Sequence, residues 1–462
     1  MNRHHEAEAI DDATESVCPV CLQRISARRI AEGRDVYLVK TCPGHGSFRT
    51  IIWRGEPDYQ AWGTGKRTPS RPPVCATARN EGCPFDCGLC PEHRQHTCCV
   101  VMEVTQRCNL SCPFCFASAP KHQSDPDLET IADWCRSLLD AGGPFNLQLS
   151  GGEPTVREDV PDIISLARGL GFPFVQLNTN GIRLATQSGY AHELKRAGLG
   201  CVFLQFDGLT DEVYQRMRGR RLLDLKLAAI RACGESEIGV VLVPTLVPGV
   251  NIAQIGEVLQ FAIDHMPTVR AVHFQPVSYF GRFPKTPTDK DRITIPEVLC
   301  EIELQTRGRI PAAAFYPPSA ENPYCSFQGK FVVQPDGSIR PSAKPQTAAC
   351  CGAGSELVQL GAGEAARRSQ KSVARQWCFP QPRQAVQEPG LDTQSLDEFL
   401  AGQQNVLSIS GMAFQDAWNL DLDRLRDCFL NALGAGGRLI PLCSYNLTSS
   451  NGRALYRGVE RV

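Results

Sequence analysis

Short apolar runs alternate with amphipathic stretches through the middle of the chain. The apolar runs, which predict buried strands, occupy residues 99–105, 145–150, 174–180, 201–207, 239–247 and 271–277. Helical periodicity appears between them at residues 128–139, 159–170, 191–197, 222–233 and 252–265. Six strands with connecting helices predict an α/β fold, a partial (β/α)6 barrel of the TIM type with parallel strands. Its site is expected at the carboxyl ends of the strands.

The flanking regions lack this regularity, so three parts are predicted: residues 1–99, 100–310 and 311–462. The first part consists of short, turn-rich segments that need bound metal to hold them, with an irregular connector at 63–73. In the last part, residues 341–390 are rich in Ala, Gly, Gln and Pro with little periodicity. Residues 395–400 and 421–433 are predicted to be helical.

Composition narrows the class of protein. The 462 residues carry a net charge of −1, which provides no basic field for nucleic acid. The chain has no apolar run of about 18 residues and no apolar segment typical of a secretory signal, so we expect a cytoplasmic location without membrane-spanning helices. The 22 cysteines are concentrated before residue 116, which favours metal and iron–sulfur sites over disulfides. Four others are expected to be buried small side chains: Cys135, Cys201, Cys233 and Cys300.

A cysteine triad directly follows the first predicted strand. Cys108, Cys112 and Cys115 have the spacing C-x3-C-x2-C, and Phe114 precedes the last of them. Three thiolates can bind three irons of a 4Fe–4S cluster and leave the fourth iron open to a substrate. The alternative is a zinc site or a structural cluster.

Polar residues end the next three predicted strands. Gly151, Gly152 and Glu153 follow the second predicted strand. Asn178 and Asn180 end the third strand, and Gln205 and Asp207 end the fourth strand. With the triad, this order resembles the radical S-adenosylmethionine (SAM) superfamily. The resemblance implies that the triad cluster cleaves SAM to a 5′-deoxyadenosyl radical, and that Phe114, the strand-end residues and residues 245–251 contact SAM. For Asn178, Asn180 and Asp207, ordinary turn or capping roles are the alternative.

Two further cysteine groups precede the triad. Cys83, Cys87 and Cys90 repeat its spacing and predict an auxiliary 4Fe–4S cluster with Cys98 as fourth ligand, or else zinc or free thiols. Cys99 is expected in the core, and His93 and His96 either tune this cluster or are exposed. Two knuckles further upstream predict a mononuclear iron or zinc site, in which His45 could instead be a turn residue. Its candidate ligands are Cys18, Cys21, Cys42 and His45.

The C-terminal part contains candidates for a third closed cluster. They are Cys325, Cys428 and Cys443, with Cys350, Cys351 or Cys378 as a fourth ligand. No local spacing links them, so ordinary thiols are the alternative.

Taken together, these motifs resemble one branch of the superfamily, the tetraether lipid synthases, often named 7,8-dihydro-6-hydroxymethylpterin dimethyltransferases. The likeness rests on CPVC, CPGHG, CPFDCGLCPEHRQHTC, EVTQRCNLSCPFCFA, SGGEPT, LNTNG, MAFQDAWNLDLDRLRDC and GRLIPLCSYN, and it is weakest across 341–390. It implies three 4Fe–4S clusters, a rubredoxin-like iron, and coupling of terminal methyl carbons of lipid chains with help from an auxiliary cluster. Methylation or coupling of a pterin or other small molecule is the alternative, and an iron–sulfur electron-transfer or scaffold protein is a third.

The resemblance also implies partners. They are a lipid or small-molecule substrate, an electron donor such as flavodoxin or ferredoxin, and peripheral contact with a membrane. A lipid chain needs a dry channel, for which aromatic residues are candidates unless they are ordinary core. These are Phe274, Phe280, Phe283, Phe315, Tyr316, Phe327 and Phe331.

Overall fold

The computed structural model describes residues 11–64, 69–118, 124–318, 320–342, 361–380 and 405–458. The predicted helix at 395–400 and the candidate ligands Cys350 and Cys351 lie outside these residues. Within them, no helix combines the length and apolar character needed to cross a membrane.

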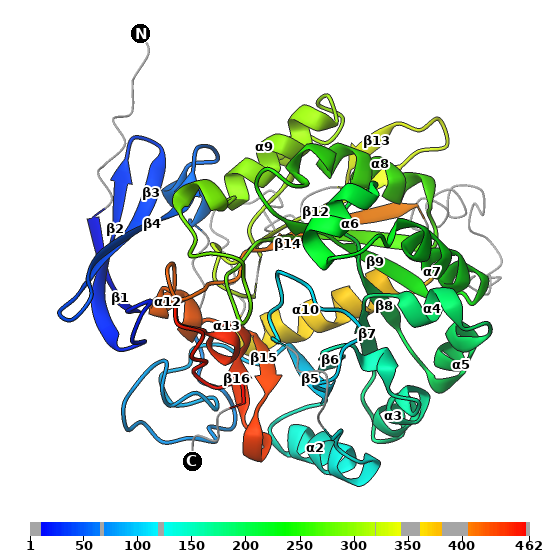
Figure 1. Ribbon diagram of the computed structural model, residues 1–462, viewed down its shortest axis with the longest axis horizontal. Helices are drawn as coiled ribbons and strands as arrows, with labels where there is room; N and C mark the ends of the chain where they lie inside the picture. The colour runs from blue at the N-terminus through cyan, green and yellow to red at the C-terminus, as the bar shows by residue number, and fades with distance from the viewer. Residues whose placement is uncertain are drawn as a thin grey trace, which may run out of the picture.

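All six predicted strands form, and they lie side by side in chain order as parallel neighbours (Figure 1). They are β5 (Cys99–Thr105), β6 (Asn146–Gly151), β7 (Val175–Thr179), β8 (Cys201–Gln205), β9 (Gly239–Val243) and β11 (Val269–Pro276), with the short β10 (Thr245–Leu246) beside β11. The predicted α/β class and partial barrel are therefore confirmed.

Helices cover the outer side of these strands (Figure 1). They are α2 (Leu128–Asp140), α3 (Val160–Gly169), α4 (Ile182–Thr186), α5 (Tyr190–Ala197), α6 (Asp211–Arg218), α7 (Leu223–Glu235), α8 (Ile255–Asp264) and α9 (Ile295–Gln305). In α2, Asp127 accepts a hydrogen bond from the Thr130 amide at 2.8 Å, which caps the helix. The same helix buries Ile131, Cys135 and Leu138 along one face. Cys135, Cys201 and Cys233 are buried as expected, but Cys300 is exposed on α9, so that prediction is wrong.

The C-terminal part extends the sheet at both edges. At one edge β14 (Val406–Met412) pairs parallel with β11, and β12 (Ser326–Val333) and β13 (Ile339–Pro341) follow antiparallel. At the other edge β15 (Leu430–Leu433) pairs parallel with β5, and β16 (Leu439–Pro441) and α13 (Leu442–Asn446) follow. The helix predicted at 421–433 is wrong: only α12 (Leu422–Arg426) forms, because pairing with β5 outweighs local helix preference in the later residues.

A helix inside the stretch of low periodicity closes the amino-terminal end of the barrel. This is α10 (Ala362–Trp377), whose buried positions are only alanines, so the sequence shows no stripe of large apolar residues. Gln370 fixes this helix to the beginnings of β5 and β6. Its side-chain amide donates to the Cys98 carbonyl at 3.0 Å, and its backbone carbonyl accepts from the Asn146 side chain at 3.1 Å. A Cβ on Gly239 would lie 2.1 Å from the Trp377 carbonyl oxygen, so glycine permits the close approach of α10 to β9.

The N-terminal part is more regular than predicted. It contains an antiparallel four-stranded sheet: β1 (Asp11–Val17), β2 (Arg24–Glu32), β3 (Asp35–Cys42) and β4 (Gly46–Arg54). Period-two burial in β3 places Val36, Leu38, Lys40 and Cys42 on one face, and the buried lysine obscures the alternation in the sequence. After the short α1 (Tyr59–Trp62), the described residues 69–98 have no helix or strand, as expected.

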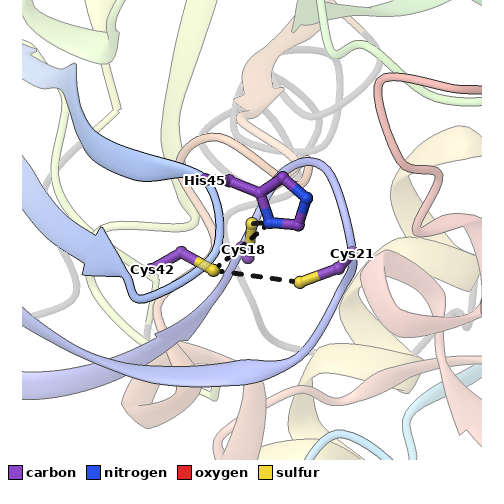
Figure 2. A group of neighbouring side chains, drawn as sticks. All are labelled: Cys18, Cys21, Cys42 and His45. Atoms are coloured by element: carbon purple, nitrogen blue, oxygen red, sulfur yellow. Dashed lines mark hydrogen bonds between the residues drawn. The ribbon is translucent and has the colours of Figure 1, made fainter.

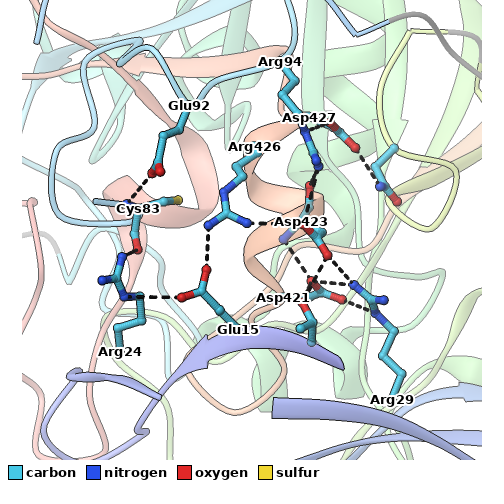
Figure 3. Close-up of polar contacts among 12 residues, drawn as sticks. Glu15, Arg24, Arg29, Cys83, Glu92, Arg94, Asp421, Asp423, Arg426 and Asp427 are labelled. Carbon is cyan, nitrogen blue, oxygen red and sulfur yellow. Dashed lines mark hydrogen bonds and ion pairs between the residues drawn. The ribbon is translucent and has the colours of Figure 1, made fainter. Parts of the chain in front are cut away.

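Ion pairs join this N-terminal sheet to the C-terminal part (Figure 3). Arg29 makes a bidentate contact with Asp421, with nitrogen–oxygen distances of 2.7 and 3.1 Å. Arg426 reaches Glu15 at 2.7 Å. Asp421 is buried and also caps α12, so it links two regions far apart in the sequence.

Replacing Asp421 tests this link. Asp421→Asn removes the buried carboxylate and leaves Arg29 with Asp423, 3.0 Å away and more exposed, so we expect a loss of about 2 kcal/mol in the free energy of unfolding. Urea unfolding followed by tryptophan fluorescence measures it. Asp133→Asn, at an exposed ion pair on α2, is the matched control and is expected to be nearly neutral. Equal midpoints for the two variants would contradict the structural role of Asp421.

Candidate active site and metal centres

One large cavity runs through the partial barrel. Its volume is about 440 Å³, within the range of pockets that bury small ligands. Its wall includes all three triad cysteines and inward-facing positions of the barrel strands, and it extends to Ser369 and Trp377 of α10. Seven predicted SAM contacts also line it: Phe114, Gly151, Gly152, Glu153, Asn178, Asn180 and Gln205.

The triad lies on a loop that the rest of the barrel holds in place. The Cys115 amide and carbonyl pair with the Arg282 backbone at 2.9 and 3.0 Å, and the Arg282 side chain donates to the Cys112 carbonyl at 2.8 Å. All three cysteines are partly buried and line the cavity. This arrangement fits a 4Fe–4S cluster with one side open to the cavity.

The two glycines after β6 are required by close backbone contacts. Gly151 has φ +134°, and a Cβ there would lie 1.9 Å from the Thr105 carbonyl oxygen. A Cβ on Gly152 would lie 2.2 Å from the Arg107 carbonyl oxygen. Glu153 follows, buried, and accepts from the Asn180 amide and the Thr179 hydroxyl, both at 2.6 Å. The segment therefore fixes the triad loop against the end of β7.

Asp207 differs from its prediction. It does not line the cavity but is fully buried in a bidentate ion pair with Arg218, both distances being 2.7 Å. Burial raises the pKa of the Cys112 thiol. Arg218 lies beside this thiol, and its positive charge partly offsets that rise. Burial raises the pKa of Cys108 to about 11, so a bound metal is needed to keep that thiol ionised at neutral pH. Asp207 thus orients a cation beside the triad.

Sequence reasoning missed Lys226. This lysine of α7 is fully buried, and its ammonium group donates to the Asn180 carbonyl and, at 3.3 Å, to the Gln205 side chain. The described residues offer it no carboxylate within salt-bridge distance. The available signal was a lysine on the buried face of α7, three and four residues before Ala229 and Ile230. Lys226 connects the ends of β7 and β8 behind side chains that line the cavity.

Part of the barrel interior is polar, whereas barrels of this type are usually filled with branched aliphatic side chains. Gln176 donates to Asn178 at 2.7 Å, and Asn178 donates to Gln148 at 3.2 Å. On the opposite wall, His273 and Ser410 are 2.9 Å apart. Phe203 and Trp377 lie beside them, with ring centroids 5.6 Å apart. The middle of the cavity therefore offers hydrogen-bonding groups without formal charge, and aromatic faces.

For most of the aromatic channel candidates, the alternative of ordinary core is confirmed. Of the seven candidates, only Phe327 lines the cavity. Phe274, Phe315, Phe327 and Phe331 belong to the main core, and Phe280 packs in a second apolar cluster. Apolar positions do surround the cavity near the triad, from other elements: Val101, Met412, Phe414, Leu430 and Leu442.

The four N-terminal ligand candidates converge at one end of the N-terminal sheet (Figure 2). His45 Nδ1 lies 3.6 Å from Cys18 Sγ and 3.4 Å from Cys42 Sγ, and Cys21 Sγ lies 4.0 Å from Cys42 Sγ. Among the described residues, this is the one set of three or more candidate ligands whose atoms all lie within 4.8 Å of one another. The hydrogen bond between Cys42 and His45 lowers the pKa of the Cys42 thiol to about 6. The set fits a single tetrahedral iron or zinc ion.

Cys83, Cys87 and Cys90 line a second, smaller cavity together with Glu92 and His93. The neighbouring Cys87 thiol, followed by burial, raises the pKa of Cys83 well above its usual range. Cys98 is not with them: it lines the main cavity, near Glu321 and Ser369. Cys99 is buried at the start of β5, as expected, and reaches the main cavity too. His93 is buried rather than exposed, and His96 faces Ser70 at 3.2 Å.

The three C-terminal candidates also converge. Burial raises the pKa of Cys428 well above its usual range, and the nearby Cys443 and Cys325 thiols add to the rise. Arg424 approaches Cys325 Sγ at 3.6 Å and supplies positive charge to the group. Cys378, at the end of α10, lies instead near Arg270 and Cys201. One buried and two half-buried cysteines beside an arginine fit an anionic cluster.

Two family models match the chain. The radical SAM superfamily model matches residues 102–262, and the HMPTM N-terminal zinc ribbon domain model matches residues 10–54. The first includes the triad and β6 to β9, and the second includes all four mononuclear ligand candidates.

Curated relatives include a 7,8-dihydro-6-hydroxymethylpterin dimethyltransferase from Methanocaldococcus jannaschii, 34% identical over 95% of this chain and 94% of the relative. A PqqA peptide cyclase from Streptomyces rochei is 32% identical over 36% of this chain and 44% of its own. Among solved structures, Streptococcus suis SuiB bound to S-adenosylmethionine is similar, with a TM-score of 0.39 and 16% identity over 46% of this chain and 47% of that chain.

A pH dependence follows from His273 on the cavity wall. Burial lowers its pKa from 6.5 to about 4, so the unfolded chain binds more protons between these values and stability falls as the pH drops through them. When the pH falls from 7.5 to 5.5, we expect the free energy of unfolding of the native chain to decrease by about 1 kcal/mol more than that of His273→Gln. Urea unfolding at both pH values measures this, with His192→Gln, at an exposed position of α5, as control. The same loss in the native chain and in His273→Gln would contradict it.

Proposed function

Because this chain belongs to the radical SAM superfamily, we propose that Cys108, Cys112 and Cys115 hold a 4Fe–4S cluster at which SAM is cleaved to begin radical chemistry on a C–H bond. The main support for this proposal is that the triad opens onto a cavity that is also lined by residues at the strand ends, including Gly151, Asn180 and Gln205. When bound and reduced, the cluster would supply the electron that breaks a C–S bond of SAM and releases the 5′-deoxyadenosyl radical.

The chain's own residues would bind and orient SAM. Gly151 and Gly152 bring backbone against the triad loop, and Asn180 and Gln205 present polar groups to the cavity. Lys226 and the Asp207–Arg218 pair hold these groups from behind. Burial of this network limits the access of water to a reactive carbon radical.

We assign the other thiol groups to supporting centres. Cys83, Cys87 and Cys90 would hold one auxiliary 4Fe–4S cluster, and Cys325, Cys428 and Cys443 another. The burial of the first set, and of Cys443 beside the half-buried Cys325 and Cys428, supports this assignment. Cys18, Cys21, Cys42 and His45 would hold iron or zinc. An external donor such as flavodoxin or ferredoxin would supply electrons.

The polar interior favours a small hydrogen-bonding molecule, such as a pterin, as the substrate. An alkyl chain placed against Gln176, Asn178 and His273 would leave without a partner the donors and acceptors that their contacts within the wall do not use, at about 1–3 kcal/mol each. A heterocycle can pair with the amides and stack on Phe203 or Trp377. The pterin named for the Methanocaldococcus jannaschii relative belongs to this class.

Coupling of lipid chain ends is the second candidate, with peripheral membrane contact to collect them. The apolar positions near the triad, including Met412 and Phe414, favour it. Joining two carbons by this route consumes two SAM and two electrons and releases two 5′-deoxyadenosine and two methionine molecules. Polar methyl transfer instead releases S-adenosylhomocysteine, so the products distinguish the reactions.

Cys112→Ala tests the radical chemistry. It removes one of three thiolates, and we expect 5′-deoxyadenosine formation from SAM and dithionite to fall to background. Iron content should fall by about one cluster. Anaerobic chromatography and iron analysis measure both quantities. Cys300→Ala, at an exposed cysteine, is the control and should retain both. Undiminished cleavage in Cys112→Ala would refute the assignment.

A pair of opposite changes tests the substrate class. Gln176→Leu removes an amide from the polar wall, and Met412→Gln adds one to the apolar wall. For a pterin-type substrate, we expect Gln176→Leu to lower kcat/KM for substrate-dependent 5′-deoxyadenosine formation about tenfold or more. A lipid substrate would instead be sensitive to Met412→Gln. Stimulation by a lipid extract but not by pterins, with Gln176→Leu unaffected, would reverse the preference.

A further inference from the structure

The small cavity with Cys83, Cys87 and Cys90 provides three thiols, whereas a closed cubane needs a fourth ligand. Sequence spacing favours Cys98, but the structure places that thiol on the main cavity near Ser369. Among the described residues that line the small cavity, two others carry groups able to bind iron, namely Glu92 and His93.

Glu92 already has partners for both carboxylate oxygens. One accepts from the Cys83 amide at 3.1 Å, and the other pairs with Arg79 at 3.0 Å (Figure 3 shows the first contact). Turning Glu92 toward iron would break the hydrogen bond that fixes the backbone of a ligand cysteine. Glu92 is therefore a support for the cysteine loop rather than a ligand.

His93 has the arrangement that metal-bound histidines usually show. Its backbone amide donates to the Cys90 carbonyl at 3.0 Å, and the residue lines the same small cavity as the three cysteines. Nε2 lies 2.7 Å from the Cys428 carbonyl oxygen. A carbonyl only accepts, so Nε2 carries the hydrogen and Nδ1 is the nitrogen left for a metal.

We infer that His93 is the fourth ligand, through Nδ1, of an auxiliary cluster held by Cys83, Cys87 and Cys90. The inference rests on the proposed auxiliary cluster. Because Cys428 belongs to the other auxiliary thiol set, the imidazole also connects the two centres: it ligates one and donates a hydrogen bond to the backbone of a cysteine of the other. Cys98 is then free to face the substrate cavity.

Nitrogen hyperfine spectroscopy tests this without an activity assay. Full-length protein with ¹⁵N-histidine is purified anaerobically, reduced with dithionite, and examined by pulsed electron paramagnetic resonance. We expect a ¹⁵N coupling typical of a directly bound imidazole in the native chain, its loss in His93→Ala, and a return of coupling when ¹⁵N-imidazole is added. His96→Ala, on the same loop, should keep the native signal. A coupling from His45 at a mononuclear iron would survive in His93→Ala and is subtracted.

Two results separate failure of the ligand assignment from failure of the cluster itself. If Cys87→Ala lowers iron and sulfide by one cluster but the native ¹⁵N signal persists in His93→Ala, the cluster exists and His93 is not its ligand. If Cys87→Ala leaves iron and sulfide unchanged, no cluster is present there and the proposed function loses this auxiliary centre. Either result overturns the inference.

Discussion

The loop that carries Cys108, Cys112 and Cys115 has no helix or strand of its own, so its shape depends on groups brought to it by the barrel. Gly151 and Gly152 permit backbone contact from β6, Arg218 reaches it from α6, and Arg282 pairs with it after β11. Each of these elements must therefore end close enough to the triad loop for its residues to hold the three thiols toward one cavity. Arg218 in turn needs Asp207, whose burial fixes the guanidinium beside Cys112. The parallel sheet is the scaffold for this convergence.

The sequence predicts this part well because its signals are local. Each buried strand appears as an apolar run, and polar or glycine residues mark the carboxyl end where the site lies. Asp207 shows the limit of such reasoning: its place at a strand end was evident, but its side chain pairs with Arg218 behind the wall. Lys226 was missed for the same reason, since its role comes from contacts with two strand ends distant in sequence.

The parts that sequence reasoning missed depend on distant partners. Helix α10 has only alanines on its buried face, so its stability rests on packing beneath the barrel rather than on a strong apolar stripe. The residues that follow α12 become a strand because the edge of β5 offers backbone hydrogen bonds. Cysteine spacing behaves in the same way. It finds thiols on one loop, such as Cys83, Cys87 and Cys90, but it misplaces Cys98, which the start of β5 carries toward the other cavity.

The polar part of the barrel interior is not explained by the stability of the fold. In a strand, alternate residues face inward, so Gln148, Gln176 and Asn178 occupy positions where a purely structural barrel would have branched aliphatic residues. Their mutual hydrogen bonds leave some donors and acceptors for another partner, because an amide side chain has more sites than one neighbour can fill. A fold that needed only stability would avoid this desolvation cost. The polar wall is therefore the feature on which the proposed preference for a hydrogen-bonding substrate, over ions and over bare alkyl chains, rests.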